Sequence, residues 1–141
     1  MLIPLVLTSE VPIYQQIRDR TVEGIANGAL PTGTVLPSTR ALAARFGINF
    51  HTVNKAYDLL RQEGLLHLTR KHGAVVARDH NSGPPAPGFL ADWEDRARTL
   101  LAEAHAHGMP STESLARCRA LLDGFEAAAQ PAHIETASGG Q

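Results

Sequence analysis

The sequence lacks several features that would place a protein outside the cell or in a membrane. Its single cysteine, Cys118, has no partner for an intrachain disulfide, in agreement with a reducing compartment. No apolar run is long enough to span a bilayer, and the apolar start over residues 1–7 has no basic leader. We therefore expect no signal peptide, no contact with a membrane, and a cytoplasmic location.

Signatures of catalysis and of metal binding are also missing. The sequence contains neither a phosphate-binding glycine loop nor a nucleophile elbow. His105, His107 and Cys118 are metal-ligand types, but helical positions two residues apart diverge by about 200°. No cluster of carboxylates accompanies them. We interpret both histidines as surface residues and expect no enzyme activity, no metal and no cofactor.

Net charge is small as well, −1 over 141 residues, so a strong basic excess is absent. The two halves differ, however. Residues 1–80 contain nine Lys or Arg and six Asp or Glu, a balance of +3, whereas residues 81–141 contain four and eight, a balance of −4. A polyanion would therefore bind the first half.

The composition, 43% hydrophobic and 19% charged, is typical of a globular protein. Prolines and glycines over residues 81–88 block helix formation and indicate a linker. Residues 130–141 have little to bury and indicate a disordered end. We therefore predict one domain over residues 1–80 and a second unit over residues 89–129.

A four-residue spacing of inward-facing side chains predicts a first helix between Pro12 and Gly28, in which Gly24 weakens the helix locally. The inward positions are Ile13, Ile17, Thr21 and Ile25. A turn over residues 30–33 and a short extended piece over residues 34–36 follow.

Two shorter helices come next, each with a capping residue and a terminating glycine. Ser38 can cap a helix that ends at Gly47, and Asn49 can cap a helix that ends at Gly64. The inward positions are Leu42 and Phe46 in the first, and Val53, Ala56, Tyr57 and Leu60 in the second. Two short helices joined by a tight turn form the motif that inserts its second helix into a DNA groove.

The strands Leu65–Thr69 and Ala74–Ala77 complete the first domain as a two-stranded wing. The predicted fold class is therefore mainly α with a small β wing. It consists of an N-terminal winged helix-turn-helix and a two-helix C-terminal dimerisation tail.

The tail is assigned to dimerisation because two helices cannot enclose a core. One apolar stripe contains Phe89, Trp93, Ala97, Leu100 and Ala104, and another, after a cap at Ser111, contains Leu115, Cys118, Leu122 and Phe125. Such stripes require a partner surface. We expect a second copy of the chain there, with packing onto the same chain as the alternative. The predicted dimerisation residues are Phe89, Trp93, Leu100, Leu101, Leu115, Leu122 and Phe125.

Four ordered sequence blocks lie in the first half of the chain: PIYQQI at 12–17, LPSTRALA at 36–43, NFHTVNKAY at 49–57 and EGLL at 63–66. Together they closely resemble the DNA-binding domain of the GntR family of bacterial transcription regulators. The resemblance covers about residues 11 to 79. The short helical tail resembles the YtrA-type subfamily, whose members lack a large effector-binding domain. The resemblance implies a homodimer that binds a two-fold symmetric operator in double-stranded DNA, most commonly as a repressor, and it assigns no small-molecule effector.

Two departures from the family pattern concern the DNA-binding surface. Family wings usually have Gly-x-Gly followed by an aromatic residue and Val, whereas residues 71–76 keep only the second glycine, Gly73, and the last Val. Phe50 occupies a position where many relatives have Arg or Pro.

Helix angles select the outward side chains of the third helix. His51, Lys55 and Gln62 lie opposite the buried stripe, Thr52 and Asn54 flank them, and Asp58 would repel phosphate. Asn can bind adenine with paired hydrogen bonds, Thr can contact thymine, and Lys can reach guanine or phosphate. A solvated polar face is the alternative interpretation.

Outside the third helix, Arg40 projects from the preceding helix, and the matching arginine in GntR relatives contacts DNA; a surface salt bridge is the alternative. The wing turn concentrates cationic donors that, by the same resemblance, approach the minor groove; a merely soluble hairpin is the alternative.

The predicted DNA-binding residues are Ser38, Thr39, Arg40, Asn49, His51, Thr52, Asn54, Lys55, Arg70, Lys71, His72 and Gly73. A winged-helix protein-interaction module without specific DNA binding is the competing function.

Overall fold

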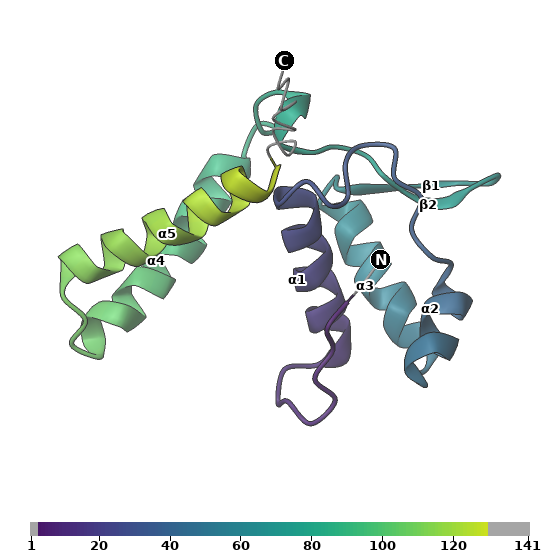
Figure 1. Ribbon diagram of the computed structural model, residues 1–141, viewed down its shortest axis with the longest axis horizontal. Helices are drawn as coiled ribbons and strands as arrows, with labels where there is room; N and C mark the ends of the chain where they lie inside the picture. The colour runs from purple at the N-terminus through teal and green to yellow at the C-terminus, as the bar shows by residue number, and fades with distance from the viewer. Residues whose placement is uncertain (1–2, 130–141) are drawn as a thin grey trace, which may run out of the picture.

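The computed structural model describes residues 3–129. Three helices and a β-hairpin come first, and a pair of long helices follows (Figure 1). The elements are α1 (Ile13–Ala26), α2 (Thr39–Phe46), α3 (Phe50–Gln62), β1 (Leu66–Thr69), β2 (Gly73–Val76), the 3-10 turn η1 (His80–Ser82), α4 (Phe89–Ala106) and α5 (Ser111–Ala129). The predicted fold, mainly α with a small β wing and two C-terminal helices, is confirmed.

Both predicted helix caps of the helix-turn-helix are present. The Ser38 hydroxyl accepts a hydrogen bond from the Ala41 amide at 3.1 Å, and the Asn49 side-chain oxygen accepts one from the His51 amide at 2.9 Å. These bonds satisfy amides that have no partner within the helix. Gly47 ends α2 with a φ of 65°, a left-handed conformation that favours glycine.

The wing differs from its prediction by one residue in each strand. Antiparallel pairing runs from Leu66 opposite Val76 to Thr69 opposite Gly73. Leu65 does not begin the strand because its amide donates to the Leu60 carbonyl at 2.9 Å, at the end of α3. The extended piece predicted at 34–36 also pairs with β2, through a bridge between Val35 and Val75.

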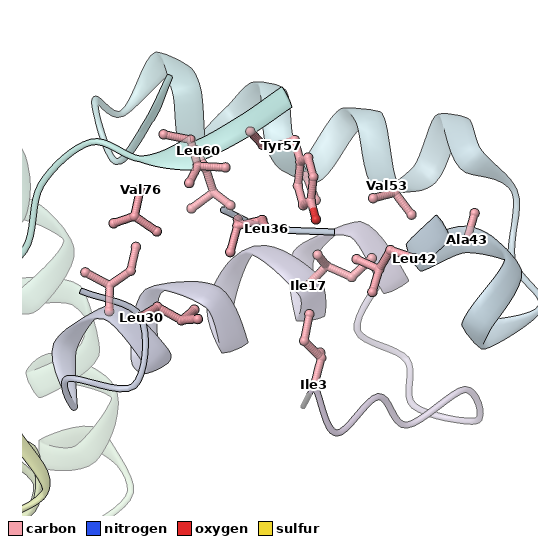
Figure 2. Packing of buried hydrophobic residues seen from close by; sticks show 14 residues of the cluster. Ile3, Ile17, Leu30, Leu36, Leu42, Ala43, Val53, Tyr57, Leu60 and Val76 are labelled. Carbon is pink, nitrogen blue, oxygen red and sulfur yellow. The ribbon is translucent and has the colours of Figure 1, made fainter. Parts of the chain in front are cut away.

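The buried core lies within residues 3–76 of the described chain. Apolar side chains from α1, α2, α3, the wing and the N-terminal segment meet there (Figure 2). Its largest fully buried members are Ile17, Leu42, Leu60, Leu66, Val53, Val76 and Thr21. The inward stripes predicted for the three helices are buried, except that Ile13 and Phe46 are half-buried at the edge of the core. The core therefore fixes α3 against α1 and α2.

A buried polar residue, Gln16, holds the N-terminal segment against α1. Its side-chain oxygen accepts from the Val6 amide at 2.8 Å, and its side-chain nitrogen donates to the Val6 and Val11 carbonyls at 3.0 and 2.9 Å. These bonds satisfy the amide that burial removes from water. Ile3, in the same N-terminal segment, is buried in the core (Figure 2).

Gly24 allows close packing on α1. A Cβ built at this position would lie 2.8 Å from Cδ1 of Leu30, which is buried. The residue that weakens the helix locally therefore makes room for a core side chain.

The end of the winged helix is tied down by Asp79, which caps the turn η1. One carboxylate oxygen of Asp79 accepts from the Thr32 amide at 2.9 Å and the other from the Asn81 amide at 2.8 Å. These hydrogen bonds lower the pKa of Asp79 because they favour its charged form. The start of the segment predicted as a linker, residues 81–88, is thus attached to the turn that follows α1.

Helices α4 and α5 lie side by side, away from the wing (Figure 1). No side chain that the structure describes in either helix is buried. Trp93 is 50% exposed and Leu115 is 71% exposed. The last turns of α5 approach the C-terminal end of α1 (Figure 1). Over residues 3–129, the helices are too short or too polar to cross a membrane.

Candidate nucleic-acid interface

Four of the predicted DNA-binding side chains of α2 and α3 line one shallow hollow beside the wing. The hollow has a volume of about 370 Å³. Its lining residues are Thr39 from α2, His51, Asn54, Lys55, Tyr57 and Asp58 from α3, and Leu68 from β1. Four of the predicted residues are therefore brought together, and the wing strand forms part of the same concave surface.

Arg40 lies in the first turn of α2 and contacts the first residue of α3. The carbon at the centre of its guanidinium group is 4.6 Å from the ring centroid of Phe50. The Phe50 and His51 rings are 4.1 Å apart between centroids. Within residues 3–129 Arg40 forms no ion pair, so the surface salt bridge considered for it is absent there.

Lys55 is exposed, and its ammonium group lies over an aromatic ring of α1. The Lys55 nitrogen is 3.9 Å from the ring centroid of Tyr14, a half-buried residue. A cation over an aromatic face is attracted by the negative charge of that face. Lys55 is therefore held at the α1 side of α3, while Asn54 is exposed beside it and Thr52 is half-buried.

The acidic residue on this helix, Asp58, is compensated by its neighbours. The Arg61 guanidinium forms an ion pair with its carboxylate, and the Gln62 side-chain amide donates to it at 3.0 Å. The hydrogen bond from Arg61 is the main cause that lowers the pKa of Asp58. The repulsion expected between Asp58 and phosphate is therefore weakened by a cation one turn away.

Three of the four predicted wing residues, Arg70, Lys71 and His72, form the turn between β1 and β2, Gly73 begins β2, and all four are exposed. The Thr69 hydroxyl accepts from the His72 amide at 2.9 Å and closes the turn. Gly73 has a φ of 73°, which a side chain would strain. Neither Arg70 nor Lys71 forms an ion pair in the described part of the chain. These residues do not line the hollow, and the turn that carries them projects at the far end of the wing (Figure 1).

Ser38 and Asn49, two of the predicted DNA-binding residues, have a structural role as helix caps. Their side-chain oxygens cap α2 and α3, and both residues are exposed at the helix starts. The caps orient the first turns of these helices, where Arg40 and His51 lie.

Three contributors to this surface were not identified from the sequence. Tyr14 and Leu68 were not proposed as site residues, and Tyr57 was predicted only as a core residue. The Tyr57 hydroxyl donates to the Pro37 carbonyl at 2.8 Å, and burial raises the pKa of Tyr57. Tyr14 belongs to the first of the four family blocks. Its place there indicated that the residue matters, but it did not indicate the contact with Lys55.

The predicted dimerisation residues are mostly exposed on α4 and α5. Phe125 is half-buried, and the others are exposed: Phe89, Trp93, Leu100, Leu101, Leu115 and Leu122. Leu90 and Leu121 are also exposed, which the predicted stripes did not include. His105 and His107 are exposed, and no group of three or more metal-ligand side chains occurs between residues 3 and 129.

Comparison with known proteins gives a consistent assignment. Residues 13–76 match the model of the family described as bacterial regulatory proteins, gntR family. The chain is 34% identical over 89 residues to the HTH-type transcriptional regulator Rv1152 of Mycobacterium tuberculosis, covering 63% of this chain and 74% of that protein. It is 31% identical over 101 residues to the HTH-type transcriptional repressor YtrA of Bacillus subtilis, covering 72% and 77%.

Solved structures agree on the fold. A structure of YtrA from Sulfolobus acidocaldarius, a GntR-family transcription factor, is 37% identical, with a TM-score of 0.58 over 75% of this chain and 99% of that one. A transcriptional antiterminator from Listeria monocytogenes EGD-e, 23% identical, shares the fold with a TM-score of 0.76 over 96% and 98% of the two chains. The chain therefore belongs to the gntR family of bacterial regulatory proteins, is of the YtrA type, and is a DNA-binding transcription regulator rather than an enzyme.

Proposed function

We propose that the protein is a cytoplasmic repressor that binds a two-fold symmetric operator as a homodimer. The observation that supports this proposal is the separation of two surfaces on opposite sides of α1. α2, α3 and the wing, whose residues line the hollow, lie on one side of α1, and α4 and α5 lie on the other (Figure 1). Most of the predicted dimerisation residues on α4 and α5 are exposed apolar side chains. Pairing through the tail would leave both hollows available to DNA.

On the DNA side, the first turns of α3 would enter the major groove. Asn54 is the residue proposed to read bases, because its amide can donate to and accept from adenine at the same time. Thr52 and His51 would contact neighbouring base edges or phosphates. Arg40 and Lys55 would bind phosphate, together with the capping residues Ser38 and Asn49 and with Thr39.

The residues at the wing tip would contact the DNA backbone next to the groove that α3 enters. Arg70, Lys71 and His72 are exposed on the turn, and Gly73 leaves space for close backbone approach. Contacts of this kind fix the orientation of a protein on DNA but do not read sequence directly.

On the tail side, a second copy of the chain would cover α4 and α5. Burying a Leu or Phe side chain is worth about 1.5 to 3 kcal/mol, so the seven predicted dimerisation residues could stabilise a pair of chains. The proposed organisation is a DNA-binding domain over residues 1–80, a linker over residues 81–88 and a dimerisation tail over residues 89–129. Residues 130–141, predicted to be a disordered end, lie outside the described residues.

Repression is supported by the relative from Bacillus subtilis, which is named a repressor. A dimer bound across an operator blocks access to that DNA without any further domain. The competing proposal, a winged-helix module that binds only proteins, would leave the exposed Asn54 and the cations around it without a ligand.

Selection of fragments from a random duplex library with the purified full chain tests the proposal. We expect enrichment of a sequence with two inverted half-sites, bound with an affinity that falls steeply as salt rises. A library that stays unenriched, with weak binding that is independent of salt, would favour the protein-interaction module.

A further inference from the structure

Phe50 is an apolar residue on the recognition surface, and burial alone does not explain its presence there. It is the first residue of α3, directly after the cap Asn49, and it is half-buried at the edge of the core. Its ring contacts the Arg40 guanidinium, at 4.6 Å, and the His51 ring, at 4.1 Å. One aromatic ring therefore touches two of the proposed DNA-binding side chains, from two different helices.

The contact with Arg40 restricts a side chain that would otherwise be mobile. Arg40 is exposed, and within residues 3–129 it forms no ion pair that would fix its guanidinium. An aromatic face attracts a guanidinium in a stacked or en face position while its N–H groups still point outward to an acceptor. A long side chain that is already ordered loses less conformational entropy when it binds.

We propose that Phe50 is a positioning residue for DNA binding, whose ring holds Arg40 in the orientation that meets a phosphate. Phe50 acts through Arg40 and reads no base itself. The inference rests on the proposed operator binding, because it gives Phe50 a role in that same site. It also explains why an exposed helix start tolerates an aromatic residue among polar neighbours.

The test is a double-mutant cycle in the full chain, with a duplex selected by the wild-type protein from a random library. Replacing Phe50 with Leu keeps an apolar side chain but removes the ring. We expect Phe50→Leu to weaken binding by about two- to fivefold for each chain bound, as expected for loss of an exposed cation–π contact. In the Arg40→Ala background the same replacement should change affinity little. Phe50→Tyr, which keeps the ring, should bind as the wild type does.

Phe46→Leu is the matched control, because Phe46 is also a half-buried aromatic residue at the edge of the core. Phe46→Leu should lower the stability of the fold. Any effect that it has on DNA affinity should be the same in the wild-type background and in the Arg40→Ala background. A ring-current shift of the Arg40 side-chain protons, measured by NMR in the unbound chain, should be lost in Phe50→Leu and kept in Phe46→Leu.

The possible outcomes separate the inference from the function on which it rests. If the wild-type chain selects no duplex, both are wrong. If the wild type binds and Phe50→Leu weakens binding equally in both Arg40 backgrounds, operator binding stands and the positioning role of Phe50 is wrong. Absence of the ring-current shift in the wild-type chain would overturn that role as well.

Discussion

The Tyr57 hydroxyl donates to the Pro37 carbonyl at 2.8 Å and so joins the middle of α3 to the residue before the cap of α2. Tyr57 is buried, and Pro37 is half-buried. The two helices of the helix-turn-helix are thus connected by their turn and by a bond between segments twenty residues apart.

Tyr57→Phe should lower the free energy of unfolding by about 0.5 to 1.5 kcal/mol, the usual net contribution of one intramolecular hydrogen bond. The ring still fills the core, so the loss comes from the Pro37 carbonyl that is left without its donor. Urea unfolding measures the change. Tyr14→Phe is the control, because the Tyr14 hydroxyl makes no hydrogen bond with the described residues, and it should leave stability nearly unchanged. Equal losses in the two variants would contradict this role of Tyr57.

The same hydroxyl predicts a dependence of stability on pH. Burial raises the pKa of Tyr57 in the folded protein, whereas in the unfolded chain a tyrosine has a pKa of about 10. Folding therefore favours the neutral form, so its contribution is complete below about pH 10 and is lost as pH rises further. The stability advantage of the wild type over Tyr57→Phe should shrink above that pH in urea titrations. An advantage that stays constant up to strongly alkaline pH would show that Tyr57 ionises equally in both states.

Asn54→Ala and Arg40→Ala should have different effects on DNA recognition. Asn54→Ala should relax preference at particular base pairs by about 1 to 3 kcal/mol each, because it removes a proposed contact with base edges. Arg40→Ala should weaken binding to all sequences more evenly, and it should reduce the dependence of affinity on salt, because it removes a phosphate contact. Competition binding with single-base variants of the selected site distinguishes the two patterns. Unchanged affinity in both variants would overturn the assignment of this surface.

Removal of residues 89–141 should leave a folded winged helix that binds its site poorly. In the described chain, every buried residue lies between Ile3 and Val76, and Asp79 fastens the end of the domain. Loss of the linkage between two DNA-binding domains typically reduces affinity by a factor of about 10² to 10⁴ without any change in contacts. Sedimentation and titration of the shortened chain measure both effects. A shortened chain that remains dimeric and binds as tightly as the full chain would place the interface in the first half.

The parts of the structure that depend on local sequence were predictable. Ser38 and Asn49 cap helices because their oxygens reach amides two or three residues away, and the buried stripe from Val53 to Leu60 follows from helix periodicity. The first wing strand begins one residue later than predicted because the Leu65 amide donates to the Leu60 carbonyl of α3, a contact that periodicity does not contain.

Contacts between separate elements were not predictable. Lys55 and Tyr14 are 41 residues apart, and only the packing of α1 against α3 brings the ammonium group over the ring. Gln16 was within a recognised block, but its three hydrogen bonds depend on how the N-terminal segment folds back. The outward faces of α2 and α3 could be identified from helix angles, whereas the hollow that they form with Leu68 required the tertiary structure.

The footprint and stoichiometry of the full chain on its selected duplex test the central claim most directly. Each chain offers one α3, and the exposed tail offers a surface for pairing, so two chains should bind each duplex. The protected regions should be related by two-fold symmetry and lie about one helical turn apart, or a multiple of it. One chain bound to a single asymmetric half-site would contradict the account.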